Sequence, residues 1–96
     1  MRRRARVDAN QSAIVAALRQ LGWGVEVTSH VGRGLPDLIA MRGGHVYFLE
    51  VKDGEKPPSA RALTGEEAAL HARWARYGVR VVVVESVDGV RRLGDT

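Results

Sequence analysis

The run of residues 46–52, Val-Tyr-Phe-Leu-Glu-Val-Lys, constrains the fold more than any other part of the chain. Side chains alternate between the two faces of a β-strand, so Phe48, Glu50 and Lys52 would share one face. The opposite face would be apolar along its whole length. Two charges at the end of an otherwise buried strand are costly unless something compensates them. The run therefore predicts a core strand that ends in a polar site.

A glycine pair, Gly43-Gly44, separates this strand from a second apolar segment at 37–42. Two glycines between apolar runs are a hairpin signal, so strands at 37–42 and 45–52 should pair antiparallel. That register places Asp37 near Glu50, and opposite residues on neighbouring strands lie roughly 5 Å apart. The hairpin therefore predicts two carboxylates close enough to share one cation.

Carboxylate oxygens suit Mg²⁺ or Mn²⁺, which usually bind one or two carboxylates together with waters and substrate phosphate oxygens. Asp37 and Glu50 meet this demand, and the main-chain carbonyl of Val51 is a further candidate ligand. Lys52 could orient or help deprotonate the attacking water and offset charge in the transition state. A Pro-Asp turn and a Glu-x-Lys pair are each common for structural reasons alone. Together, on adjacent strands, they indicate metal-dependent cleavage of phosphodiester bonds.

Three segments carry a closer likeness, namely 34–38 (GLPDL), 49–54 (LEVKDG) and 56–64 (KPPSARALT). With them the chain resembles the PD-(D/E)xK nuclease superfamily and, within it, the small stand-alone VRR-NUC proteins of phages and bacteria. The resemblance covers nearly the whole chain. It implies a restriction-endonuclease-like fold and metal-dependent phosphodiester cleavage. The similarity of such short members to Holliday junction resolvases implies a homodimer acting on branched DNA, such as a four-way junction.

Two positions depart from the pattern of these nucleases. Their first helix often carries a glutamate facing the metal, whereas here Gln11 is the expected helper, with Asn10 or Asp8 as alternatives. Their second helix often carries a glutamine, and this chain has Glu67 at the matching position. Glu67 would contact a water or the substrate, or would only strengthen the first helical turn, where the helix dipole favours carboxylates.

The fold class expected from these patterns is α/β, with a mixed central sheet flanked by helices in the order αβββαβ(β). The valine-rich segment at 79–85 is typical of a strand buried on both faces in the middle of a sheet. Thr64 and Glu67 have the spacing of a capping box. The boundaries of the expected helices and strands follow from the periodicity of apolar residues and from the positions of glycine and proline. The expected elements are a helix over 8–21, strands over 25–29, 37–42 and 45–52, a loop over 53–63, a helix over 64–77, a strand over 79–85 and an optional edge strand over 90–93.

Ninety-six residues make one domain, which we expect over 8–96 after a basic N-terminal arm at 1–7. The net charge is +4, and all but two of the 15 basic residues are arginines. This balance favours a polyanionic partner, here DNA, although arginine-rich codon usage would give the same bias. The predicted backbone contacts are Arg33, Lys56, Ser59 and Arg61. The loop that carries the last three would overhang the site, or would be a plain connector.

The sequence also limits the alternatives. It contains no cysteine, which excludes a disulfide framework and a thiolate zinc site. His30, His45 and His71 lack ligand spacing, although His71 could face the substrate from the second helix. No small-molecule cofactor is expected. No apolar run approaches the roughly 18 residues of a membrane span, so no membrane association and a cytoplasmic location are expected.

Two other functions compete with the nuclease. The first is a module that binds nucleic acid with its basic face and does not cleave it. The second is a small regulatory or structural phage protein whose carboxylates form ordinary ion pairs with arginines. Binding without a metal requirement would favour the first, and failure to bind Mn²⁺ would favour the second.

Overall fold

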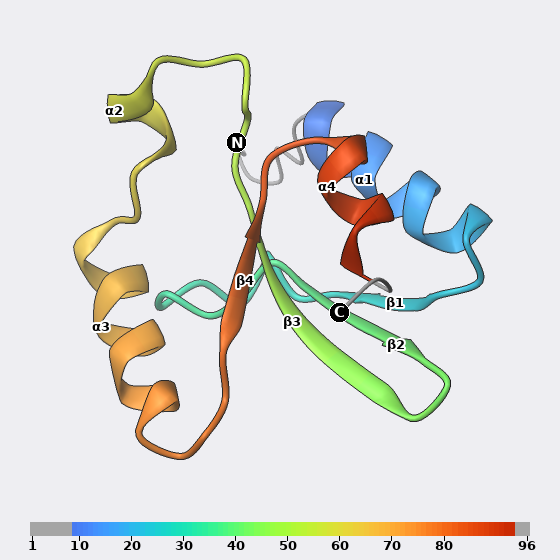
Figure 1. The fold of residues 1–96 in the computed structure, drawn as a ribbon. Helices are drawn as coiled ribbons and strands as arrows, with labels where there is room; N and C mark the ends of the chain where they lie inside the picture. The colour runs from blue at the N-terminus through green and yellow to red at the C-terminus, as the bar shows by residue number, and fades with distance from the viewer. Residues whose placement is uncertain (1–8, 94–96) are drawn as a thin grey trace.

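The structure is a computed structural model that describes residues 9–93. A four-stranded sheet in the order β1-β2-β3-β4 lies between two groups of helices (Figure 1). The strands are β1 (Gly24–Val27), β2 (Leu38–Arg42), β3 (His45–Val51) and β4 (Val81–Val84). The helices are α1 (Ala9–Gln20), α2 (Pro58–Arg61), α3 (Gly65–Ala75) and α4 (Val87–Arg91). The first three strands are antiparallel and β4 runs parallel to β3, so the sheet is mixed, as predicted.

The predicted hairpin between β2 and β3 is confirmed. Gly43 and Gly44 both have positive φ, 58° and 83°, as a tight two-residue turn between twisted strands requires. The pairing runs from Arg42 opposite His45 to Leu38 opposite Leu49. Asp37 directly precedes β2, and its amide continues the ladder by donating to the Leu49 carbonyl at 2.9 Å. This register brings Asp37 beside the charged end of β3.

The two faces of the sheet have different partners. Helices α1 and α4 cover the face that carries Leu49, and they form the main core with it (Figure 1). Helix α3 covers the face that carries Phe48, Glu50 and Lys52. The alternation expected along residues 46–52 is therefore confirmed. The buried residues of the core are Ile14, Leu18, Trp23, Val25, Leu38, Ala40, Leu49, Val84, Val90 and Leu93.

The expected edge strand over 90–93 is wrong, because Val87–Arg91 forms helix α4. Ser86 caps this helix, since its hydroxyl accepts from the Gly89 amide at 3.3 Å. Val90 and Leu93 are both buried against the core, and their spacing of three residues is helical. Glycine has a low helical preference, so this short helix around Gly89 was not expected from the sequence.

Two further expectations about the sheet and its loops are wrong. Strand β4 lies at an edge of the sheet, and Val83 is 42% exposed, so the valine run is not buried on both faces. The segment over 53–63 contains the one-turn helix α2, which begins at Pro58, a residue tolerated in a first helical turn. The predicted capping box is confirmed at the start of α3. Within residues 9–93, no helix is long and apolar enough to cross a bilayer.

The predicted arm over 1–7 and Asp8 lie outside the described residues, so the boundary between arm and domain stays a prediction.

Candidate active site

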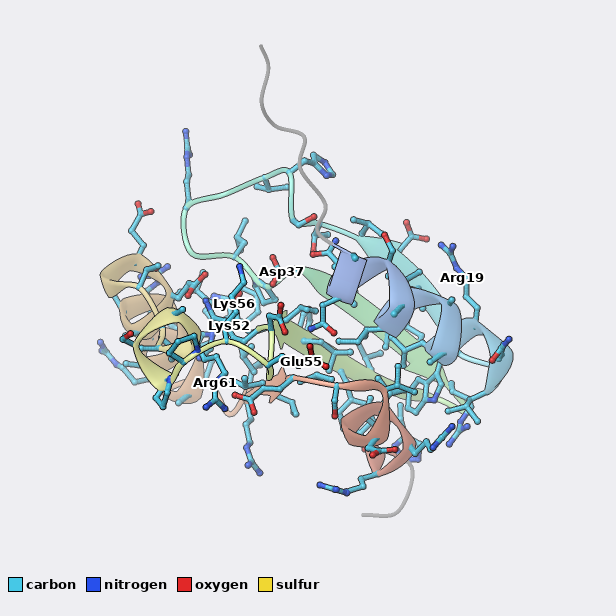
Figure 2. All side chains as sticks on the ribbon, turned by 90° about the horizontal axis from the view of Figure 1, so that it is seen from above. Arg19, Asp37, Lys52, Glu55, Lys56 and Arg61 are labelled. Atoms are coloured by element: carbon cyan, nitrogen blue, oxygen red, sulfur yellow. The ribbon has the colours of Figure 1, made fainter. Side chains whose placement is uncertain are left out.

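Asp37 is fixed against the end of β3 from two directions. Its main-chain amide donates to Leu49, and its Oδ2 accepts a hydrogen bond of 2.8 Å from the Val51 amide. Figure 2, which looks down on the sheet edge, shows Asp37 and Lys52 between the two groups of helices. The hairpin register therefore presents the Asp37 carboxylate to the strand that carries Glu50 and Lys52.

Glu50 is an acidic side chain inside the protein, with only 1% of its surface exposed. Burial, assisted by a hydrogen bond and negative charge from Asp37, raises the pKa of Glu50 from 4.5 to about 9, although Lys52 opposes this shift. Ionising both of these adjacent carboxyls is unfavourable, because their negative charges repel each other and Glu50 is buried away from water. A divalent cation would remove this penalty by allowing both to ionise.

The donor set fits a hard divalent cation. Among residues 9–93, no group of three or more His, Cys, Asp and Glu side chains is arranged to hold a metal. Asp37 and Glu50 would therefore act with water and main-chain oxygen, which is the mixed set that Mg²⁺ accepts. The structure shows Val51 contacting Asp37 through its amide. Its carbonyl stays a predicted ligand.

Lys52 forms a short ion pair with Glu67 across the gap between β3 and α3. The Lys52 Nζ lies 2.7 Å from the Glu67 Oε1, and both side chains are mostly buried. The same oxygen accepts from the Thr64 amide at 2.9 Å, which closes the capping box. Burial acts to raise the pKa of Glu67, but hydrogen bonds from Lys52 and Thr64 hold it below the ordinary value. Of the two roles left open for Glu67, the capping role is confirmed, and the structure adds an ion pair with Lys52. A contact with water or the substrate stays a prediction.

His71 reaches the site from the next turn of α3. Its Nε2 lies 3.4 Å from the Glu50 Oε1, and its side chain is 16% exposed. One turn further, the Trp74 ring packs edge-on against Phe48 with centroids 5.1 Å apart. Every second residue from Phe48 to Lys52 thus meets one turn of α3. The spacings of four and three residues indicate from the sequence that these three side chains share one face of α3, but not which strand residue each one meets. The pairs are Phe48 with Trp74, Glu50 with His71, and Lys52 with Glu67.

The first helix contacts the end of the strand that carries the site through Asn10, which was an alternative to Gln11, and the helper role of Gln11 stays a prediction. Gln11 is buried and donates from Nε2 to the Ser29 hydroxyl at 3.1 Å. Asn10 donates from Nδ2 to the main-chain carbonyl of Lys52 at 2.7 Å and lies 3.4 Å from that of Glu85. Asn10 therefore ties the start of α1 to the strand that carries the site.

The four predicted DNA contacts surround the site unequally. Arg33 is exposed and has φ of 60° between two glycines of positive φ, so the loop turns sharply there. Lys56 and Ser59 are exposed on the segment that follows Lys52. Arg61 is partly exposed, and its Nη1 lies 3.5 Å from the Glu85 Oε1. Figure 2 shows Lys56 and Arg61 on the same side of the molecule as Lys52, with Arg19 far away on α1.

A groove of about 630 Å³ opens between the start of α1 and the segment after Lys52. Asp53, Glu55 and Glu85 line it and make it acidic. Repulsion from these carboxylates disfavours a phosphate in the groove.

A mixed sheet between helices, with Asp37, Glu50 and Lys52 converging at one end, defines a nuclease-like α/β domain. The structure is similar to a solved structure described as a VRR_NUC domain, with 31% sequence identity over 88% of this chain and 89% of that chain and a TM-score of 0.65. No family model matches the sequence, and no curated protein matches it. The identity and the coverage show that the chain belongs to the VRR-NUC family of nucleases, with a restriction-endonuclease-like fold.

Proposed function

We propose that this chain hydrolyses phosphodiester bonds in DNA with Mg²⁺ or Mn²⁺ held by Asp37, Glu50 and the Val51 carbonyl. The observation that carries the proposal is the Glu50 carboxyl, 1% exposed, beside Asp37 and two residues before Lys52. A buried acidic pair with a lysine at its side is unfavourable for stability alone, but it suits a site that binds a cation.

Each side chain has a separate task in this proposal. The cation, when bound, supplies positive charge that polarises the phosphate and lowers the pKa of water. Asp37 is held for binding by the Val51 amide. Lys52 keeps its ammonium group in place through Glu67, where it orients the attacking water and stabilises charge on the phosphate in the transition state.

Exposed basic residues would hold the DNA backbone. Arg33, Lys56 and Ser59 are free to contact phosphate oxygens from the solvent side of the site. Arg61 pairs with Glu85 at 3.5 Å in a partly exposed position, and such pairs contribute little stability. A phosphate could therefore recruit Arg61 at small cost. Binding should weaken as salt rises, because each neutralised phosphate releases counterions.

The proposed substrate is branched DNA, and the proposed active form is a homodimer. The domain measures 35 × 32 × 25 Å and is too small to enclose a long duplex by itself. A two-fold dimer would present one site to each of two strands, which is the symmetry that a four-way junction demands. This part of the proposal rests on the analogy with junction resolvases.

The test is cleavage of a labelled linear duplex and a labelled four-way junction of the same arm sequence, with Mg²⁺, Mn²⁺ or EDTA. The wild-type chain is compared with Lys52→Ala and with the control Arg19→Ala, which removes an exposed charge on the far side of α1. We expect cutting by the wild type and the control, with loss in EDTA and in Lys52→Ala. Binding with no metal-dependent cutting would refute the nuclease and favour the binding module.

The two substrates separate the chemistry from the specificity. Paired symmetric cuts in the junction alone would support a resolvase-like dimer. Equal cutting of the duplex and the junction would retain the nuclease and remove the junction preference. The oligomeric state, measured by light scattering with and without junction DNA, tests the dimer independently.

A further inference from the structure

The imidazole of His71 faces the buried end of Glu50, one turn of α3 beyond the ion pair between Glu67 and Lys52. The distance from Nε2 to Oε1 is 3.4 Å, and both side chains are largely shielded from water. This is longer than an ordinary N–H···O hydrogen bond of about 2.7–3.2 Å. Hydrogen bonds in unliganded sites often shorten once the site is occupied.

Glu50 needs a neighbouring donor more than Asp37 does. The Asp37 carboxylate already receives the Val51 amide, which fixes its orientation. The Glu50 carboxylate, when ionised as a ligand, would have lone pairs buried inside the protein, and an unpaired buried acceptor is costly. In the tautomer that carries its hydrogen on Nε2, His71 is placed to donate to one of them.

The attachment of α3 does not depend on His71. Leu70 is 2% exposed, Trp74 packs on Phe48, and Glu67 pairs with Lys52. Gly34 also lies so close to the first turn that an added Cβ would clash with the Glu66 carbonyl oxygen. With the helix already held at these points, a polar ring aimed at a buried carboxyl is not needed for packing.

We propose that His71 is a positioning residue that holds the Glu50 carboxylate in the orientation that binds the cation. The inference rests on the proposed function, because it assumes that Glu50 is a ligand. Side chains that orient a metal ligand are typically worth about 10- to 100-fold in metal affinity. Loss of the imidazole should therefore weaken Mn²⁺ binding without removing the site.

The experiment is calorimetric titration of Mn²⁺ into the DNA-free protein for the wild type, His71→Phe and His71→Gln. Phenylalanine keeps a flat ring and removes the donor, whereas glutamine offers an amide near the position of Nε2. The control Trp74→Phe alters the same face of α3 where it meets Phe48. Thermal unfolding of each variant in EDTA reports its stability separately.

We expect the Kd for Mn²⁺ to rise about 10- to 100-fold in His71→Phe and to return to within a few-fold of wild type in His71→Gln. Trp74→Phe should bind Mn²⁺ as the wild type does. Cleavage by His71→Phe should recover when Mn²⁺ is raised to saturation, because the catalytic groups remain.

The outcomes separate this inference from the proposed function. If the wild type binds Mn²⁺ and cuts DNA, but His71→Phe binds it equally tightly, the positioning role is wrong and the nuclease stands. Equal weakening in His71→Phe, His71→Gln and Trp74→Phe would show that His71 acts only through the packing of α3, which also overturns the inference. A wild type that binds no Mn²⁺ would overturn both proposals.

Discussion

Replacing Glu50 with glutamine should stabilise the metal-free protein while it abolishes metal-dependent cleavage. Glutamine has nearly the same shape, carries no charge at any pH and needs no proton to remain buried. The free energy of unfolding should therefore become higher than that of the wild type at neutral pH. This combination is expected for a side chain that is retained for binding and opposes folding.

The magnitude follows from the raised pKa of Glu50, which burial and Asp37 shift from 4.5 to about 9. Below pH 4.5 the folded and unfolded chains both hold the proton, and glutamine should differ little from glutamic acid. Between these two pKa values only the unfolded chain loses the proton, so the wild type loses about 1.4 kcal/mol of stability per pH unit. By pH 7 the deficit relative to Glu50→Gln should reach about 3 kcal/mol.

The assay is urea denaturation in EDTA at several pH values from about 4 to 7, for the wild type and Glu50→Gln. Glu26→Gln is the matched control, because Glu26 is exposed on β1 and its replacement should not change the pH dependence. Parallel pH profiles for the wild type and Glu50→Gln would refute the reasoning. A variant less stable than the wild type at pH 7 would do so as well.

Three other predictions concern α3 and the cation. Gly34→Ala should lower the free energy of unfolding, measured by urea denaturation, by about 3 kcal/mol, because φ is +78° and the new Cβ meets the Glu66 carbonyl. Gly32 has φ of +76° but open space around it, so Gly32→Ala should cost only about 1 kcal/mol. Equal costs would contradict the close packing. Thr64→Ala should lower the free energy of unfolding by about 1 kcal/mol because the N-terminal cap of α3 is lost, whereas Thr64→Ser should keep a stability near that of the wild type. An unchanged urea midpoint in Thr64→Ala would contradict this prediction. Mn²⁺ at about 100 times Kd should stabilise the wild type by about 2.7 kcal/mol, and Asp37→Asn should lose most of this gain in thermal unfolding.

The hairpin was predictable because its signal is local. Two adjacent glycines permit the positive φ values of a tight turn, and the turn fixes which residues of β2 and β3 face each other. The nearness of Asp37 and Glu50 follows from that register. The distribution of β3 side chains between the two faces follows from the strand period. The core of the site was therefore readable from a short stretch of sequence.

The misread parts depend on contacts between distant segments. Strand β4 pairs with β3 on one side only, and the described part of the chain places no strand on its other side. A run of valines does not reveal whether that second neighbour is present. Helix α4 packs against α1 and buries Val90 in the core, which outweighs the low helical preference of Gly89.

The roles of His71 and Glu67 were only partly visible in the sequence. Glu67 was recognised as a capping residue, and His71 as a residue that could face the substrate. Their contacts with Lys52 and Glu50 require the angle at which α3 crosses β3, and helical spacing alone does not give that angle. Asn10 was named as an alternative to Gln11, since one turn of helix cannot decide which polar residue meets the strand.

The central claim is that Asp37 and Glu50 hold a divalent cation, and the most direct test is anomalous diffraction from a crystal grown with Mn²⁺. The account predicts a manganese peak within about 2.0–2.4 Å of an oxygen of each carboxylate, beside Lys52. A peak only in the acidic groove of Asp53, Glu55 and Glu85, or none at saturating Mn²⁺, would contradict it.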